Sequence, residues 1–269
     1  MVTSLRQSPL PRLRRFASLL AMLAGRDLKL RYRGAFLGAL WAVLQPLAML
    51  ALYTFVFSIV LRVKMGSDAS PHTFALYLMA GMLPWLAISE ALARSVSAIV
   101  DNANLVKKVV FPLEVLPVVP VVSALAAQAI GTALLLAALL ALGRSLHVTA
   151  LLLPVLVVPQ VLMTVGLAWL AGSFGVFVRD LGQFIGLALT TWMFLTPIFY
   201  APEAVPTAFR AVFDLNPLVA LIDAHRSVLL EGALPDARSL GILTLASAGV
   251  FGLGLAWFRR SKPLFADVL

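Results

Sequence analysis

Runs of apolar residues long enough to cross a lipid bilayer constrain this chain more than any other feature. They occupy six segments in which Glu90 is the only charged residue, namely 36–61, 73–93, 115–143, 148–178, 181–202 and 239–258. A helix rises about 1.5 Å per residue, so about 20 residues cross a hydrocarbon core of about 30 Å. The runs do not alternate between apolar and polar residues, as strands of a membrane barrel would. We therefore predict an all-α integral membrane protein with six transmembrane helices.

The composition excludes a soluble globular domain. Of the 269 residues, 61% are hydrophobic and only 12% are charged, whereas soluble domains carry about 25% charged residues. The chain has no cysteine, which removes disulfides, thiolate metal ligands and cysteine nucleophiles. We expect a cytoplasmic N-terminal segment at 1–35, a transmembrane domain at 36–258 and a short cytoplasmic tail at 259–269.

The distribution of basic residues predicts the orientation. If the N-terminus is cytoplasmic, the cytoplasmic segments hold 15 of the 21 Lys and Arg residues, in agreement with the positive-inside rule. Acidic and basic residues cancel in the outside connections. The net charge of +9 is therefore mainly a topology signal, and we expect cytoplasmic termini and no nucleic-acid partner.

The first 35 residues are predicted to contain a basic amphipathic helix over about 13–33. Leu13, Phe16 and Leu20 share one face of this helix, which is typical of a helix lying in the membrane interface. The sequence Gly25-Arg26-Asp27 offers no convincing cleavage site for a signal peptide. The helix either anchors the N-terminus to the cytoplasmic leaflet or also packs against a cytoplasmic partner.

The connection from Asp101 to Glu114 mixes capping residues, Lys107 and Lys108 with apolar residues, and it reaches a proline at 112. Such a pattern is typical of a short helix that stops before the proline. A solvated charged loop would explain the lysines but would leave the apolar side chains in water. We therefore predict a short helix outside the membrane that docks on a soluble protein.

The longest outside connection runs from Glu203 to Asp236 and is interrupted at Asn216-Pro217. Its apolar pieces are too short to span, so we predict two half-helices that dip into the outer leaflet, with protein shielding the break. Asp223, His225 and Arg226 are then expected near the outer surface. A hydrogen-bonding cluster is favoured there over a catalytic site, because no nucleophile is placed nearby.

Glu90 lies about 25 Å along its helix from Thr73, at about 1.5 Å per residue, and Arg94 follows one turn later. An ion pair between Glu90 and Arg94 is the simpler interpretation, and a functional intramembrane acid is the alternative. The patterns Gly34-Ala-Phe-Leu-Gly38 and Gly182-Gln-Phe-Ile-Gly186 permit close contact between helices.

Aromatic residues recur in the first, second and fifth predicted spans. They are Trp41, Tyr53, Phe55, Phe57, Trp85, Trp192, Phe194, Phe199 and Tyr200. These rings either pack within the bundle or line a channel whose apolar ring faces suit sugars. The sequence contains no P-loop, metalloprotease or nucleophile-elbow motif, so uphill transport would draw on an ion gradient or on another subunit.

Several short motifs follow one another along nearly the whole chain. They are Asp27-Leu-Lys-Leu-Arg-Tyr-Arg-Gly34 with Leu37-Gly38 and Trp41, Gln45-Pro46, Asn104-Leu-Val-Lys-Lys108 with Phe111-Pro112, Arg179-Asp180, Leu195-Thr-Pro-Ile-Phe-Tyr200 and Asn216-Pro217. In these motifs and their order the chain resembles the membrane subunit of type-2 ABC exporters, specifically the branch that exports lipid-linked polysaccharides such as O-antigen, capsule and teichoic acid.

The resemblance implies a bacterial inner-membrane exporter built from two copies of this chain and two ATPase subunits. The ATPase would bind ATP and Mg²⁺, while this chain would bind no cofactor and catalyse no reaction. The substrate would be a glycan on an undecaprenyl diphosphate carrier, moving between the two copies among membrane lipids.

The resemblance also assigns roles to individual residues. Contact with the ATPase would involve Asp101, Asn102, Asn104, Leu105, Val106, Lys107, Lys108 and Phe111, and the interface helix would contribute Arg15, Phe16, Arg26, Asp27, Lys29, Arg31 and Arg33. The substrate path would be lined by Trp41, Tyr53, Phe57, Trp85, Trp192, Phe194, Phe199 and Tyr200, and the outer gate would include Pro197, Asp214, Asn216, Pro217 and Arg226.

Three alternatives stay open at this point. An exporter of the same type could carry a drug or another lipid. An intramembrane enzyme of glycan or lipid metabolism would need convergent acids or a nucleophile with its base. A gradient-driven carrier would normally show internal repeats with ionisable residues at the midplane, which this sequence lacks.

Overall fold

A computed structural model describes residues 9–31, 37–60, 71–108, 111–200 and 205–269 of the chain. Within these ranges all regular secondary structure is helical, which confirms the predicted all-α class. The α-helices are α1 (Pro9–Arg31), α2 (Trp41–Tyr53), α3 (Pro71–Ser95), α4 (Ala103–Lys108), α5 (Val118–Ala141), α6 (Leu153–Phe177), α7 (Leu181–Phe194), α8 (Arg210–Asp214), α9 (Pro217–Arg226), α10 (Ala237–Ser261) and α11 (Phe265–Val268). A π-helical segment, Thr54–Val60, continues α2, and a second, Ser227–Glu231, continues α9.

Four stretches of helix are long and apolar enough to cross a membrane. They are Thr73–Ser95, Leu113–Ala141, Val148–Phe177 and Ala237–Val268. The other two predicted spans, 36–61 and 181–202, contain the shorter apolar helices Trp41–Val56 and Leu181–Phe194 and extend into residues that the structure does not describe. The structure thus establishes several apolar helices, whereas the number six and the domain boundaries stay predictions.

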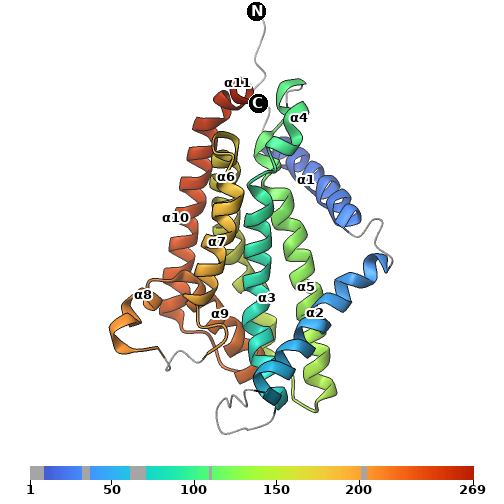
Figure 1. Cartoon of the computed structure of the whole chain (residues 1–269), viewed down its shortest axis with the longest axis vertical. Helices are drawn as coiled ribbons and strands as arrows, with labels where there is room; N and C mark the ends of the chain where they lie inside the picture. Colours follow the sequence, from blue (N-terminus) through green and yellow to red (C-terminus); the bar gives the residue numbers. More distant parts are fainter. Residues whose placement is uncertain (1–8, 32–36, 61–70, 109–110, 201–204) are drawn as a thin grey trace, which may run out of the picture.

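Helix α3 forms the centre of the bundle, with α2, α5, α6 and α7 arranged around it (Figure 1). About 78% of its most apolar stretch is buried inside the protein, against 17–33% for the other three long helices. Beside α3, the side-chain amides of Gln128 of α5 and Gln160 of α6 donate to one another at 3.1 and 2.6 Å. Such a pair holds helices together where the surroundings are apolar.

Glycine allows close packing of α6 on α10. A Cβ atom added at Gly166 would lie 2.5 Å from the carbonyl oxygen of Val250, and one added at Gly254 would meet the backbone of Gly166. The sequence patterns predict close helix contacts at other glycines. A Cβ at Gly182 or Gly186 would meet nothing within 4 Å, so that predicted pattern makes no close contact within the described chain, and Gly34 lies outside it.

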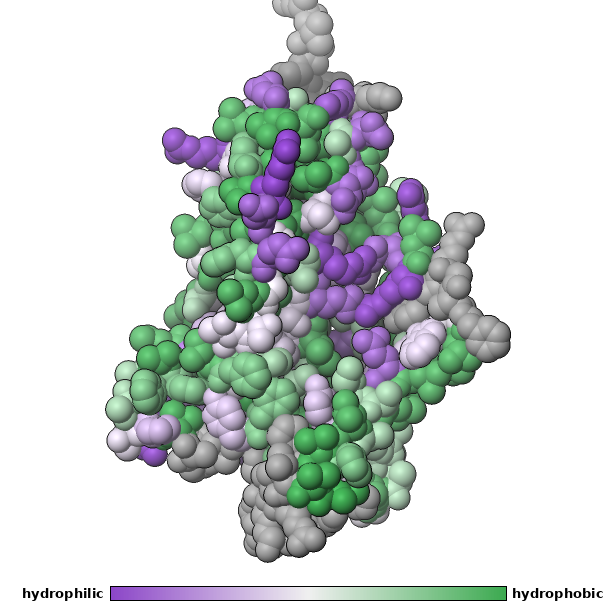
Figure 2. Space-filling model, viewed as in Figure 1, coloured by the Kyte–Doolittle hydropathy of each residue, from purple (hydrophilic) through white to green (hydrophobic). Residues whose placement is uncertain are grey.

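The two ends of the bundle differ in structure. Helices α4 and α11 lie together at one end, and α8 and α9 lie at the other, while α1 runs obliquely beside α3 and α5 (Figure 1). Lys107 Nζ donates to the main-chain oxygen of Leu269 at 2.5 Å, and Lys262 pairs with Glu114 at 2.9 Å. On the face shown in Figure 2, hydrophilic residues gather at the α4 end and the opposite end is mostly hydrophobic.

Candidate functional site

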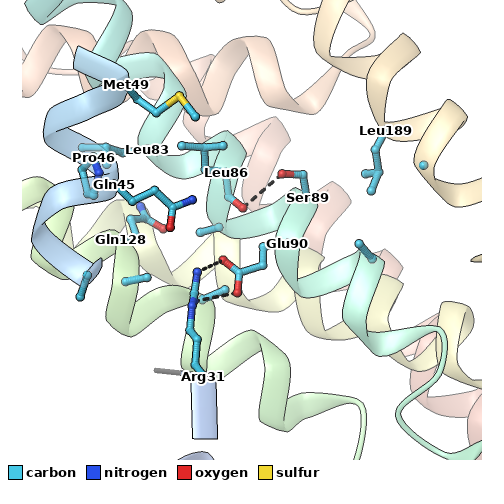
Figure 3. Close-up of a pocket in the computed structure, with 16 residues that line it drawn as sticks. Arg31, Gln45, Pro46, Met49, Leu83, Leu86, Ser89, Glu90, Gln128 and Leu189 are labelled. Atoms are coloured by element: carbon cyan, nitrogen blue, oxygen red, sulfur yellow. Dashed lines mark hydrogen bonds and ion pairs between the residues drawn. The ribbon is translucent and has the colours of Figure 1, made fainter. Parts of the chain in front are cut away.

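A cavity of about 500 Å³ lies between α2, α3, α5 and α7, next to the end of α1 (Figure 3). Its lining residues are Arg31, Ala42, Gln45, Pro46, Met49, Leu83, Leu86, Ala87, Ser89, Glu90, Ala93, Ala124, Ala127, Gln128, Gly186 and Leu189. Most are aliphatic. The amides of Gln45 and Gln128 project into the space, and one charged pair stands at the α1 side.

The charged pair joins Arg31, the last residue of α1, to Glu90 of α3. Arg31 Nη1 lies 2.7 Å from Glu90 Oε1, and Arg31 Nη2 donates to Glu90 Oε2 at 2.8 Å. The predicted pair of Glu90 with Arg94 is also present, at the longer distance of 3.5 Å. The sequence therefore identified one partner of Glu90 and missed the closer one, because Arg31 is 59 residues away along the chain.

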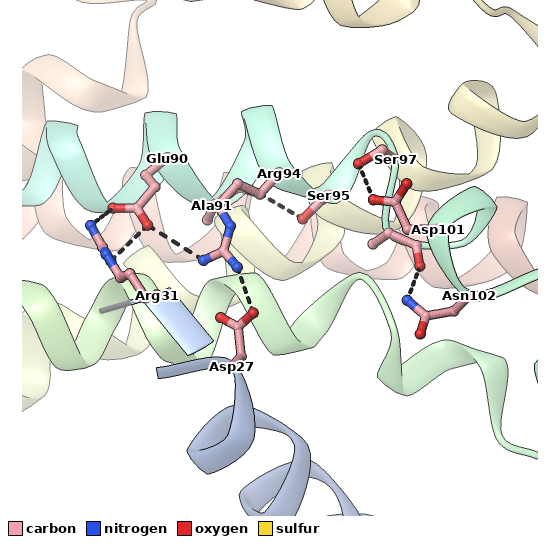
Figure 4. Close-up of polar contacts among 10 residues, drawn as sticks. Asp27, Arg31, Glu90, Ala91, Arg94, Ser95, Ser97, Asp101 and Asn102 are labelled. Atoms are coloured by element: carbon pink, nitrogen blue, oxygen red, sulfur yellow. Dashed lines mark hydrogen bonds and ion pairs between the residues drawn. The ribbon is translucent and has the colours of Figure 1, made fainter. Parts of the chain in front are cut away.

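A second ion pair of opposite polarity lies one turn later on α3 and one turn earlier on α1. Arg94 Nη2 of α3 donates to Asp27 Oδ1 of α1 at 2.5 Å. Asp27 and Arg31 are four residues apart on α1, and Glu90 and Arg94 are four apart on α3, so each pair of residues lies on one helix face. The two ion pairs together fasten α1 against α3 (Figure 4).

Polar contacts continue from this point toward α4. The Ser97 hydroxyl donates to Asp101 Oδ2 at 2.6 Å, and the Asn102 amide donates to the carbonyl of Ala98 at 2.9 Å (Figure 4). These bonds reinforce the turn that leads from α3 through Val100–Asn102 into α4. One continuous stretch, residues 83–108, therefore contains residues that line the cavity, the residues that pair with α1, and helix α4.

The predicted docking helix forms, as α4. Asn104 and Lys107 are exposed, whereas Leu105, Val106 and Phe111 are partly buried against the chain's own core. We had expected the apolar side chains to need a partner to cover them, and the protein covers part of their surface itself. The side chain of Lys108 and residues 109–110 lie outside the described structure.

The interface helix is longer at its start than predicted, since α1 begins at Pro9. Ala24 is buried and Leu20 packs on the core, while Arg26 and Lys29 are exposed and Phe16 is half-buried. The helix is therefore amphipathic, as expected. The side chain of Arg15, and all of Arg33, lie outside the described structure.

The segment after α7 contains the predicted break, with α8 and α9 on either side of Asn216-Pro217. Asn216 caps α9 by accepting from the Leu218 amide at 3.1 Å. Its side chain also accepts from Trp192 Nε1 at 3.0 Å and donates to Thr196 Oγ1 at 2.9 Å. The helix cap of α9 is thereby tied to the end of α7, while Asp214 ends α8 on the exposed side of the break.

Arg226, at the end of α9, is only 2% exposed. Its guanidinium donates to the carbonyl oxygens of Pro197 at 2.9 Å and Ile198 at 2.8 Å, and it lies 3.6 Å from the centre of the Tyr77 ring. These contacts hold the turn after α7 against α3 and α9.

His225 and Arg226 are buried within the protein, so their side chains are not solvated, and their place near the outer side of the membrane stays a prediction. Asp223 pairs with Arg226 at 3.8 Å, with the Asp223 side chain 44% exposed and the Arg226 side chain buried, so two of the three predicted polar residues contact one another. Burial lowers the pKa of His225, which favours the neutral ring, and its Nδ1 lies 2.8 Å from the Leu221 carbonyl. That geometry assigns the proton to Nδ1 and suits a structural role.

The predicted path aromatics mostly contact one another within the chain. Trp85 is 3% exposed and packs edge to face against Trp192, with the ring centres 6.0 Å apart. The centre of the Phe199 ring lies 6.2 Å from that of Tyr53 and 6.1 Å from that of Phe194. Trp41 and Phe194 are exposed on the single chain, Tyr200 packs against Phe213, and the Phe57 side chain lies outside the described structure. Of the aromatics whose side chains the structure describes, none borders the 500 Å³ cavity, so their role as a path stays a prediction.

Several long apolar helices, with an amphipathic helix fastened beside them, describe a multi-pass membrane protein. The chain belongs to the ABC-2 type transporter membrane family, whose model matches residues 18–230.

Comparison with curated proteins finds relatives over nearly the whole length. The chain is 32% identical to the O-antigen export system permease protein RfbA of Myxococcus xanthus, over 94% of this chain and 95% of that protein. It is 29% identical to an O-antigen export system permease protein RfbA of Klebsiella pneumoniae, over 93% and 95% of the two chains. It is also 25% identical to the polysialic acid transport protein KpsM of Escherichia coli, over 88% and 91%.

Proposed function

We propose that this chain is the permease subunit of an ATP-driven exporter that moves a lipid-linked polysaccharide of the O-antigen type across the bacterial inner membrane. The observation that carries the proposal is the full-length similarity to O-antigen export permeases, at 32% identity. Energy comes from a separate ABC ATPase subunit, which binds ATP and Mg²⁺.

The ATPase contacts the end of the bundle formed by α4, with the exposed face of α1 beside it. In this proposal α4 and its flanks contribute Asp101, Asn102, Asn104, Leu105, Val106, Lys107, Lys108 and Phe111, and the α1 region contributes Arg15, Phe16, Arg26, Lys29 and Arg33, while Asp27 and Arg31 hold the same helix to α3. Support comes from the contacts that connect α4 to α3 and from the ion pairs that connect α3 to α1. A movement of α4 would therefore reach both α3 and α1.

Two copies of the chain form the path for the glycan, and two ATPase subunits drive it. The exposed rings of Trp41 and Phe194 support such a path, because large apolar side chains on a single chain mark surfaces for contact with lipid, substrate or a second copy. Tyr53, Phe57, Trp85, Trp192, Phe199 and Tyr200 complete this path. Pro197, Asp214, Asn216, Pro217 and Arg226 form its outer gate, and both termini lie in the cytoplasm.

Co-purification with the ATPase tests the docking arrangement. Lys107→Glu combined with Asn104→Asp should abolish retention of the ATPase, because it reverses one charge and adds another on two exposed residues of α4. Arg210→Glu combined with Leu215→Asp makes the same change of charge on exposed residues of the opposite end and should leave retention intact. Equal retention in both variants would exclude α4 as the docking helix.

A second candidate substrate is a capsular polysaccharide, which the similarity to the polysialic acid transport protein KpsM favours. A complementation experiment distinguishes O-antigen from capsular polysaccharide as the substrate. The chain, expressed with its partner ATPase, should restore surface O-antigen in a strain that lacks its own O-antigen permease. Restoration of surface capsule alone, in a strain that lacks the capsule permease, would replace the O-antigen assignment.

A further inference from the structure

A second cavity, of about 400 Å³, lies at the end of the bundle away from α4. It is bounded by the start of α3, the loop after α5 and the π-helical segment Ser227–Glu231. Its lining residues are Thr73, Leu76, Tyr77, Leu139, Arg144, Ser145, His147, Leu229, Leu230 and Glu231. It shares none of them with the cavity beside Arg31 and Glu90.

The walls of this cavity are fixed by contacts between segments far apart in the sequence. Arg144 Nη2 donates to Thr73 Oγ1 at 2.7 Å, across 71 residues. Thr149 Oγ1 donates to the Val228 carbonyl at 2.9 Å. Gly232 has a φ of +67°, and a Cβ atom there would lie 2.5 Å from His147 Nδ1, so only glycine lets the His147 ring sit against this turn. The cavity is therefore preformed rather than an opening between loose loops.

The lining is divided by chemistry. Leu76, Leu139, Leu229 and Leu230 form the apolar part. The polar part carries one guanidinium, Arg144, and one carboxylate, Glu231, whose Oε2 accepts from the Ser227 hydroxyl at 3.2 Å. A simple anion would meet Glu231 and be repelled. A ligand with an anionic group for Arg144, an ammonium group for Glu231 and an apolar portion matches all three features.

The position of the cavity further limits the class of ligand that could bind there. Thr73 starts the apolar stretch of α3 and Leu139 lies in the last turn of α5, so the cavity sits where membrane-crossing helices end and lipid headgroups begin. We propose that it binds the phosphoethanolamine headgroup of a phospholipid, with the phosphate at Arg144, the ammonium at Glu231 and the start of the acyl chains on the leucines. Its volume lies within the range of about 300–1,000 Å³ that small-molecule sites occupy.

The site is connected to the segment that follows α7 through Tyr77. The Tyr77 side chain borders the cavity, and the Arg226 guanidinium lies 3.6 Å from the centre of the same ring. Arg226 in turn donates to the Pro197 and Ile198 carbonyls. A bound headgroup would therefore stabilise the arrangement in which α9 holds the turn after α7.

Lipid binding to the purified, delipidated full-length chain tests the proposal. Native mass spectrometry and thermal melting would be measured with phosphatidylethanolamine, phosphatidylglycerol and phosphatidylcholine in mixed micelles. The wild-type chain should retain phosphatidylethanolamine preferentially and melt at a higher temperature with it. Arg144→Gln should weaken retention of phosphatidylethanolamine about tenfold or more, because hydrogen bonds to a charged group are lost.

Glu231→Gln gives a sharper outcome than simple loss of binding. Removal of the carboxylate should abolish the preference for phosphatidylethanolamine over phosphatidylglycerol, because nothing then repels the anionic lipid or pairs with the ammonium. Arg238→Gln, on an exposed side chain at the start of α10, serves as the control and should leave the preference unchanged. Arg144→Lys, which keeps the charge, should restore most of the binding lost in Arg144→Gln.

Several results would overturn the proposal. One is a wild-type chain that shows no preference among the three lipids, and another is a preference that survives both Arg144→Gln and Glu231→Gln. Equal protection by inorganic phosphate or by glycerophosphoethanolamine would show that the site recognises a free phosphate compound rather than a lipid. Protection by a soluble oligosaccharide alone would assign the cavity to sugar. Each readout is independent of export, so failure here leaves the proposed function untouched.

Discussion

Arg31 and Glu90 join the end of α1 to the middle of the bundle, with their side chains 2.7 Å apart and only 20% and 27% exposed. The pair borders the 500 Å³ cavity on one side and the second ion pair, Asp27 with Arg94, on the other. The position of α1 and the shape of the cavity are therefore set by the same contact. A displacement of α1 that breaks this contact would also open one wall of the cavity.

Exchange of the two charges tests this relationship. Arg31→Glu and Glu90→Arg should each weaken export and lower the melting temperature, because each leaves two like charges facing one another. The double variant should recover much of the loss, with a coupling energy of about 1 kcal/mol or more in a double-mutant cycle. Purely additive effects would mean that the contact does not hold α1 in place.

Arg226 should contribute strongly to stability through its carbonyl partners. Arg226→Met keeps much of the side-chain volume but leaves the oxygens of Pro197 and Ile198 without this donor, at a cost of about 1–3 kcal/mol for each buried group left unpaired. Arg226→Lys should recover only part of the loss, since one ammonium cannot reproduce the planar guanidinium. Thermal melting in detergent measures both, with Arg210→Met on exposed α8 as the control.

The close packing of α6 on α10 gives a prediction with a matched pair of glycines. Gly254→Val should destabilise the protein by about 1–3 kcal/mol or more, because the added side chain meets the backbone of Gly166. Gly252→Val, on the same helix, adds the same side chain where a Cβ meets nothing within 4 Å. It should leave the melting temperature nearly unchanged. Equal melting temperatures in both variants would show that α6 and α10 can accommodate the added side chain, so that this close packing does not decide stability.

The elements of this fold were largely predictable from sequence, because hydrophobic run length and the positions of proline and glycine act locally. The short helix after α3 and the break at Asn216-Pro217 both form where the sequence placed them. Contacts between distant residues were less accessible. The closer partner of Glu90 lies on another helix. Gly166 and Gly254, which let α6 and α10 pack closely, belong to no pattern that distinguishes them from Gly182 and Gly186.

At the candidate site, too, contacts between distant residues were not predictable from the sequence. The topology expected from the sequence puts Arg226 near the outer side of the membrane, where a charged side chain is normally solvated. The structure instead buries it, since two main-chain carbonyls and the Tyr77 ring replace water around the guanidinium. Those partners come from segments 28 and 29 residues away and from α3, and no local pattern records them.

Trp41 separates the two interpretations of the aromatic residues, packing and path. It is 43% exposed on the single chain, so Trp41→Ala should hardly change the melting temperature of the isolated chain. If the rings guide sugars, the same variant should slow glycan export several-fold in cells that retain normal amounts of the protein. Leu40→Ala, on an adjacent side chain that is 52% exposed, should slow export much less, because an aliphatic side chain offers no flat ring for a sugar to stack on. Equal export by Trp41→Ala and wild type would leave packing as the role of this ring, whereas equal slowing by both variants would point to contact between the two copies.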